Sequence, residues 1–470
     1  MITESLPKRY GDPEQRPQGE TGASRPKTAT DRISDIVLTL RTPGWWWLGF
    51  AVSLALLLSL VYLITMIFTR GVGIWGINVP VVWGIAIINL VFWIGIGHAG
   101  TLISAILLLM RQEWRGSLSR FAEAMTLFAL ACAGLFPILH LGRPWLAIWL
   151  LPYPDSLQLN PQWRSPLVWD AFAISTYLLV SLLFWFMGMI PDLGMMRDRA
   201  KNRAVKYFYG ALALGWRGDA VHWERYHTAT FLLAALATPL VISVHSVVSL
   251  DFAVSLLPGW HHTIFPPYFV AGAVFSGLAM VLLVAIPLRS ALKLQNIITL
   301  GHIDAAGKVM LVTGLIVVYG YAMEIFAPIY TGNPSEWALT ISRFTGTYAG
   351  AFWALLIINA GLSQLLWFKA VRTNMGMMMF ISLFVMVGMW LERFIIIVTS
   401  LNINLQSSMW REFIPRGFDY LTIIAPFGLF FTLLFLFIRL LPMIPMAETE
   451  ELLHEKGLSS VEAEVATSGD

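Results

Sequence analysis

The chain has 470 residues, of which 57% are hydrophobic and only 13% are charged. About a quarter of the residues of a soluble domain are usually charged, so this composition excludes an ordinary water-soluble protein. The formal net charge of +3 is too small to indicate a nucleic-acid partner. Cys132 is the single cysteine, which excludes an internal disulfide and an iron–sulfur cluster held by about four thiolates of this chain.

The predicted elements begin after a polar leader, residues 1–43, which we expect to be cytoplasmic and partly disordered. A membrane-spanning helix needs about 20 mostly apolar residues, and ten stretches of the sequence meet this requirement. They cover residues 44–68, 81–110, 121–141, 166–190, 228–256, 267–286, 306–326, 347–368, 375–400 and 421–441. An acidic tail, residues 442–470, which we expect to be cytoplasmic, ends the sequence. The pattern predicts an all-α polytopic membrane protein with about ten transmembrane helices.

Basic residues indicate the orientation of these helices. Arginine and lysine are concentrated in the loops after the second, fourth, sixth and eighth spans, and the alternate loops hold few of them. Cytoplasmic loops of membrane proteins carry this excess of positive charge. We therefore expect both termini to be cytoplasmic, and tryptophans such as Trp75 and Trp260 to lie at the opposite membrane surface.

A weak internal repeat divides the spans into two groups. The second span contains Gly-Ile-Gly-His-Ala-Gly-Thr at 95–101, and the sixth contains Ala-Gly-Ala-Val-Phe-Ser-Gly at 271–277. This similarity predicts two parallel four-helix bundles, residues 81–256 and 267–400. The first helix with its outer loop (44–80) and the last loop and helix (401–441) would flank them. Chance similarity between apolar helices is the alternative.

Ionisable residues inside the spans are the candidates for chemistry, because each costs about 2.5–3.5 kcal/mol at the centre of a membrane. Most of them gather toward the non-cytoplasmic face. A histidine and a carboxyl group facing one cavity from adjacent helices could bind a quinol and accept its protons. The residues concerned are His98, His140, Asp170, His245, Asp251, Glu324, Glu392 and Arg393.

Each candidate also has a structural interpretation. His140 could cap a helix end, and His98 could hydrogen-bond a neighbouring helix. Glu392 and Arg393 could form a purely structural ion pair. A haem held between His98 and His245 stays open, since the two lie at similar depths. The spacing of the histidines and carboxylates predicts no metal site.

A short segment carries a resemblance to a known family. Residues 140–145, His-Leu-Gly-Arg-Pro-Trp, and residues 164–170, Arg-Ser-Pro-Leu-Val-Trp-Asp, flank one loop. They resemble the NrfD/PsrC family of quinol-interacting membrane subunits. The ten spans look like its larger members, the ActC-type and ActF-type subunits of bacterial alternative complex III, and the prominent His98, His140 and Asp170 look more like the ActC type.

The resemblance implies a quinol-binding subunit of an oxidoreductase complex in the bacterial inner membrane. Menaquinol or ubiquinol would be oxidised near the periplasmic face by contact with His140, Asp170 and His98 in the first bundle. The remaining buried residues, Asp251, Glu324, Arg393, Glu392 and His245, would transfer protons or compensate charge, and proton translocation is implied as an accompanying activity. No cofactor would be bound covalently.

The same resemblance implies several partner subunits. Electrons would pass to an iron–sulfur subunit and a multihaem c-type cytochrome, beside a second NrfD-like membrane subunit. Two other functions fit the sequence: a secondary transporter, because ten spans with a repeat and buried charges suit one, and a structural membrane anchor without a quinol site.

Overall fold

The computed structural model describes residues 29–39, 42–82, 84–150, 166–295 and 297–449, and these ranges contain helices and no strands. Ten helical segments among them are long and apolar enough to cross a membrane, so the chain is a multi-pass integral membrane protein. Helices satisfy the hydrogen bonds of their own backbone, which lipid cannot do. The ten segments are α2 (Gly44–Arg70), α3 to α4 (Gly84–Leu109), α5 (Ser119–His140), α6 (Pro166–Arg199), α8 (Ala220–Ala253), α9 (Phe265–Ala291), α10 (Leu300–Thr331), α12 to η6 (Ala349–Trp367), α14 to α15 (Met375–Asn402) and α16 (Gly417–Leu440).

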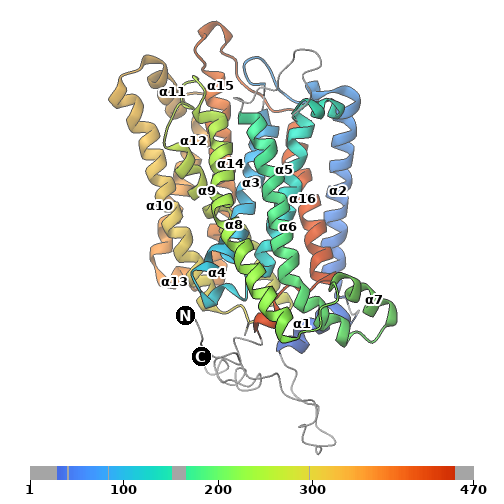
Figure 1. Cartoon of the computed structure of the whole chain (residues 1–470). Coiled ribbons are helices and arrows are strands. Elements are labelled where there is room, and N and C mark those ends of the chain that lie inside the picture. The colour runs from blue at the N-terminus through green and yellow to red at the C-terminus, as the bar shows by residue number, and fades with distance from the viewer. Residues whose placement is uncertain (1–28, 40–41, 83, 151–165, 296, 450–470) are drawn as a thin grey trace, which may run out of the picture.

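The helices stand side by side, as Figure 1 shows. Helices α3, α5, α6 and α8 pack around one another, and α9, α10, α12 and α14 form a second group that contacts the first through α3 and α8. Helices α2 and α16 pair along the flank of the first group. The end that carries α11 is the upper end in Figure 1, and the end that carries α1 and α7 is the lower end.

Among the described residues, three amphipathic helices of ten or more residues lie outside the spans and were not predicted from the sequence. They are α1 (Ala29–Leu38), α7 (Arg203–Leu212) and α11 (Pro334–Thr345). Each is amphipathic, and each packs at least one side chain against the bundle: Ile33, Tyr209 and Leu339 are buried. The leader is therefore helical over α1, whereas its first 28 residues lie outside the described part of the chain.

Two spans also extend beyond their predicted ends. Helix α6 runs to Arg199 and α8 begins at Ala220, about two turns past the apolar stretches in each case. Charged residues such as Arg197 and Arg225 occupy these extensions. The helix continues because its backbone hydrogen bonds do not depend on an apolar environment.

Three spans contain a π-helical segment: η2 (Leu102–Ile106), η5 (Leu356–Gly361) and η7 (Ile395–Thr399). Such segments are rare and frequently occur at functional sites. Buried polar residues lie in each of them, namely Ser104, Asn359 and Thr399.

Glycines permit some of the closest helix contacts in the fold. A Cβ added at Gly277 of α9 would lie 2.5 Å from the Cβ of Ala99 in α3, and one at Gly428 of α16 would lie 2.3 Å from the backbone nitrogen of Leu57 in α2. Small residues at such positions let helix backbones approach within a membrane.

Candidate functional site

Two carboxyl groups meet near the upper end of the first group of helices. Asp170 of α6 and Asp251 of α8 interact with each other, and they are only 4% and 7% exposed. None of their four oxygens has a hydrogen-bond partner among the described residues. Two buried carboxylates this close in space repel each other when both are charged, so this upper carboxyl pair is suited to binding a proton.

A histidine pair lies deeper in the same group. The rings of His98 in α3 and His245 in α8 are 4.5 Å apart between centroids, and both residues are fully enclosed. His98 Nδ1 lies 2.7 Å from the carbonyl oxygen of Ile94, whereas His98 Nε2 and both ring nitrogens of His245 lack partners in the described part of the chain. Direct ring contact leaves no space for a haem between them, which the sequence alone left open.

Asp251 lies six positions after His245 in α8, which is about 9 Å along the helix axis. Tyr177 of α6 lies beside His98, with ring centroids 5.3 Å apart. Its hydroxyl is 2.7 Å from the hydroxyl of Thr101 and donates to the carbonyl of Gly97. Protonatable side chains and hydroxyl groups thus form a series that begins at the upper carboxyl pair and reaches the middle of the helices.

A lower charge cluster completes the series. Arg120 Nη1 is 2.8 Å from Asp192 Oδ2, and Arg120 Nε is 3.9 Å from Glu123 Oε2. The carboxyl of Glu123 lies near Ser104 in η2, whose hydroxyl donates to the carbonyl oxygen of Gly100 over 2.7 Å. The lower charge cluster (Arg120, Glu123 and Asp192) therefore connects to the same span that carries His98.

His140 ends α5 at its upper end. Its ring packs against Trp75 and Phe136, with centroids 6.4 Å away in each case, and its Nε2 is buried without a partner among described residues. Residues 151–165, which lead from His140 toward Asp170 along the chain, lie outside the described ranges. A shared pocket for His140 and Asp170 stays a prediction.

The second group of helices has its own polar network. The hydroxyl of Tyr321 in α10 donates to the carboxylate of Glu392 in α14, and Glu392 forms an ion pair with Arg393. Asn359 Nδ2 in η5 donates to Tyr321 Oη over 2.8 Å. Arg393 is 1% exposed, and its Nε and Nη2 have no partner within the part of the chain described.

A second ion pair lies above this network. Arg343 of α11 places Nη1 2.9 Å from Glu324 Oε2 of α10, and its Nε donates to Thr399 Oγ1 over 3.1 Å. The hydroxyl of Ser400 lies 3.5 Å from the remaining nitrogen, Nη2. Both charged residues are buried, so the guanidinium of Arg343 is matched by acceptors on two other spans.

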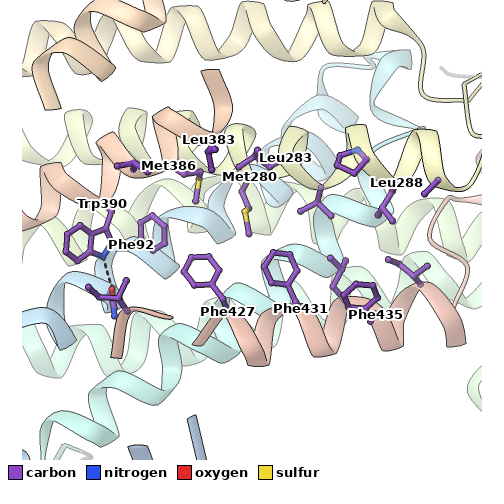
Figure 2. A pocket seen from close by; sticks show the side chains of 18 of the residues that line it. Phe92, Met280, Leu283, Leu288, Leu383, Met386, Trp390, Phe427, Phe431 and Phe435 are labelled. Carbon is purple, nitrogen blue, oxygen red and sulfur yellow. Dashed lines mark hydrogen bonds between the residues drawn. The ribbon is translucent and has the colours of Figure 1, made fainter. Parts of the chain in front are cut away.

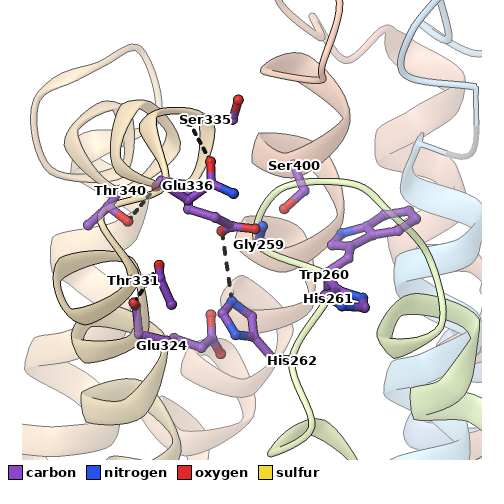
Figure 3. Close-up of polar contacts among 12 residues, drawn as sticks. Gly259, Trp260, His261, His262, Glu324, Thr331, Ser335, Glu336, Thr340 and Ser400 are labelled. Atoms are coloured by element: carbon purple, nitrogen blue, oxygen red, sulfur yellow. Dashed lines mark hydrogen bonds and ion pairs between the residues drawn. The ribbon is translucent and has the colours of Figure 1, made fainter.

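The turn between α8 and α9 covers the upper end of this network, as Figure 3 shows. Glu336 of α11 accepts a hydrogen bond of 2.8 Å from the backbone nitrogen of Gly259, and its carboxylate is 4.0 Å from His262 Nε2. Burial lowers the pKa of His262 below its ordinary value, against the opposing effect of Glu336. His262 is therefore mainly neutral near pH 7.

Phe269 of α9 lies beside both polar networks. Its ring centroid is 5.9 Å from that of His245 and 5.7 Å from the guanidinium carbon of Arg393. One aromatic ring thus lies between the histidine pair and the ion pair of the second group.

The sequence pattern indicates the buried charges within the spans but misses some of their partners. It places Arg120 and Arg343 in loops, although both are buried in ion pairs with residues of other helices. It does not single out Asp192, Glu123 or Tyr177. A sequence signal for the two acidic residues does exist. Acidic residues near the cytoplasmic end of one predicted span, such as Asp192, can be paired with arginines near the same end of another span, such as Arg120. The described residues contain no group of three or more histidine, cysteine or acidic side chains that could hold a metal ion.

A multi-pass membrane protein with buried protonatable groups is the class that the fold and these contacts define. Residues 75–404 match the family described as polysulphide reductase, NrfD, and the chain belongs to this family. A similar protein is a putative membrane subunit of dimethyl sulfoxide reductase from Halobacterium salinarum, 25% identical over 268 residues. The alignment covers 56% of this chain and 56% of the relative, so the chain spans little more than half the length of that protein.

Proposed function

We propose that this chain is the quinol-binding membrane subunit of a multi-subunit oxidoreductase. Quinol would be oxidised at the upper end, in the first group of helices, and its electrons would leave to redox groups held by partner subunits. The family of the chain supports a role in such a complex. The single cysteine agrees with electron carriers that belong to other chains.

The observation that carries the proposal is the upper carboxyl pair. Asp170 and Asp251 are buried, and their carboxyl oxygens have no hydrogen-bond partner in the described residues, although burying an acid without compensation is costly. A quinol hydroxyl would supply the missing partner. Structural charges elsewhere in the chain, such as Glu324, are matched by a cation instead.

In the proposed reaction, a quinol becomes a quinone and loses two protons and two electrons. A carboxylate of the upper carboxyl pair takes the proton of one quinol hydroxyl, and the electron pair of the broken O–H bond stays on that oxygen. The unpartnered Nε2 of His140 takes the proton of the other hydroxyl, which accounts for the second proton. The two electrons would pass one at a time to an iron–sulfur cluster or haem held by a partner subunit.

Proton movement beyond the pair would use the groups beneath it. The histidine pair, Tyr177, Thr101 and Ser104 lead toward the lower charge cluster, and His245 approaches Arg393 around Phe269. Neutral histidines and hydroxyls can pass protons by exchanging donor and acceptor roles. We include proton translocation along this series in the proposal, with Glu324, Glu392 and Arg393 compensating charge.

For the complex itself, we propose alternative complex III and an ActC-type rather than ActF-type role. The ten membrane-spanning helices and the segment from His140 to Asp170 support this assignment. A reductase complex related to the putative dimethyl sulfoxide reductase of Halobacterium salinarum is the second candidate, favoured by that similarity. The subunits that copurify with the chain would distinguish the two complexes. Alternative complex III would contain an iron–sulfur subunit, a multihaem c-type cytochrome and a second NrfD-like subunit.

The test is quinol oxidation by the purified complex carrying Asp170→Asn or Asp251→Asn. Asparagine keeps the shape of the side chain but accepts no proton, so we expect kcat to fall by about 10²-fold or more. Asp198→Asn is the matched control, because Asp198 is exposed at the lower end in a local pair with Arg197. Its activity should equal that of the wild type.

Assembly is measured in the same samples by the yield of partner subunits. Normal assembly with full activity in both aspartate variants would refute the proposed quinol site. The chain would then be interpreted as a structural membrane anchor. Purification without any redox subunit, together with solute uptake in vesicles, would support a secondary transporter instead.

A further inference from the structure

A long apolar groove opens where α16 passes across α9 and α14, as Figure 2 shows. Its volume is ≈ 760 Å³. Phe427, Phe431 and Phe435 follow one face of α16 along the groove, and side chains such as Met280 and Leu283 of α9 lie opposite. This groove belongs to neither of the polar networks.

The amide group at the wall of the groove already has its hydrogen-bond partners. Asn89 is the one lining residue with an amide side chain; its Nδ2 donates to the carbonyl of Thr422 over 2.8 Å, and its Oδ1 accepts from Trp390 Nε1 over 2.9 Å. The rest of the lining is almost entirely hydrocarbon. An occupant would therefore be held by apolar contact alone along this wall.

A partner helix suits the groove poorly. Close helix contacts in this chain use glycines that face a neighbouring helix, as Gly277 and Gly428 do. The groove instead presents large side chains, and Ala291 is its one residue as small as alanine. Bulky and flexible side chains such as Met280 and Met386 adapt to a thin, flexible chain better than to a rigid cylinder.

The direction and charge of the groove match a phospholipid. Its lining extends along α16 from Ile423 to Ile438, about 22 Å of a hydrocarbon core that is about 30 Å thick. Basic residues follow its lower end in sequence: Lys293 two residues after Ala291, and Arg439 after Ile438. Arg439 Nη1 already donates to the carbonyl oxygen of Ile36, so Lys293 is the cation available to a ligand. Lys293 is exposed. Positive charge at one end of an apolar groove is complementary to a lipid phosphate.

We propose that this groove is a binding site for one acyl chain of a membrane phospholipid, whose phosphate lies at the lower end beside Lys293. The site is distinct from the proposed quinol site, because neither the upper carboxyl pair nor the histidine pair contributes to its lining. It would fix α16 against α9 and α14 with a lipid that is retained during purification.

The test uses the complex purified in detergent, with retained phospholipid measured by native mass spectrometry. Leu283→Trp fills the groove, and we expect about one phospholipid fewer per chain than in the wild type. Leu179→Trp is the matched control, since Leu179 faces outward from α6 and is 57% exposed; this variant should keep the wild-type number. Lys293→Gln leaves the packing unchanged and should release the same lipid at a lower detergent concentration.

A second arm adds 1-palmitoyl-2-oleoyl-phosphatidylglycerol to delipidated complex and measures rebinding. Rebinding by wild type and Leu179→Trp but not by Leu283→Trp supports the proposal. Equal lipid numbers in all variants would overturn it, as would loss of a partner subunit from Leu283→Trp alone. Displacement of the lipid by an equal amount of an isoprenoid quinone would assign the groove to a quinone tail and overturn the phospholipid.

Discussion

At the scale of single residues, Arg343 and Arg393 show two ways of burying a guanidinium. Each of three nitrogens of Arg343 faces an acceptor, on Glu324, Thr399 and Ser400. Arg393 pairs through Nη1 and leaves Nε and Nη2 without partners among the described residues. A fully paired arginine is typical of a structural role, whereas unpaired buried donors are available to a proton carrier or water.

This difference predicts the effect of breaking the Glu324–Arg343 pair. Arg343→Met leaves the Glu324 carboxylate buried without its cation, and we expect the free energy of unfolding to fall by about 3–5 kcal/mol. Adding Glu324→Leu removes the stranded charge and should restore most of the loss. Chemical denaturation in detergent micelles measures both variants.

Lys308→Gln is the control for charge alone, because Lys308 pairs with Asp304 but is 60% exposed. An exposed pair contributes under about 1 kcal/mol. If the double variant were no more stable than Arg343→Met, the ion pair would not be the reason for the loss.

At the scale of the helices, the two groups depend on a close contact between α3 and α9. Gly277 of α9 lies against Ala99 and the carbonyl of Ile96, where any larger residue would overlap them. The π-segment η2 begins four residues after His98 in the same span. His98 thus lies next to the close α3–α9 contact at Ala99 and four residues before the π-helical segment η2, and both features constrain its position.

We predict opposite effects for two glycine-to-alanine substitutions. Gly277→Ala places a methyl group 2.5 Å from Ala99 Cβ, and such overpacking should cost about 1–3 kcal/mol. Gly134→Ala in α5 meets nothing within 4 Å, so it should stabilise the helix by about 0.5–1 kcal/mol. Thermal unfolding of both variants in the same detergent is the measurement, and an equal rise in Tm for both would contradict the close contact.

The spans could be predicted from the sequence because the requirement of each span is local: about 20 apolar residues must lie together. The partners of the buried charges could not. Arg120 looks like the end of a basic loop until Asp192, from the far end of the next span, is placed beside it. Likewise, the depths of His98 and His245 were foreseeable, but their ring contact depends on how α3 and α8 cross.

At the scale of the whole molecule, the buried titratable groups of the first group of helices lie at three levels: the upper carboxyl pair, the histidine pair and the lower charge cluster. Residues 442–447 cover the lowest level. Residues 442–447 are buried, and the backbone nitrogen of Ala447 donates to Asp192 Oδ1 over 3.0 Å. Arg115 and Glu448 add an ion pair of 3.3 Å beside it. Access to the lower charge cluster therefore passes this segment, whereas the upper carboxyl pair lies at the opposite end.

The direction of the proposed chemistry depends on which end faces the cytoplasm, and the basic residues predict that the lower end does. Cys132 is the single cysteine, and it is buried, so Cys132→Ser gives a background without reactive thiols. In that background Thr331→Cys places an exposed thiol at the upper end and Lys201→Cys places one at the lower end. A membrane-impermeant maleimide applied to right-side-out vesicles should label Thr331→Cys at once and Lys201→Cys only after lysis. The reverse pattern would put Asp170 and Asp251 on the cytoplasmic side, and quinol oxidation could then not release its protons to the outside through the upper carboxyl pair.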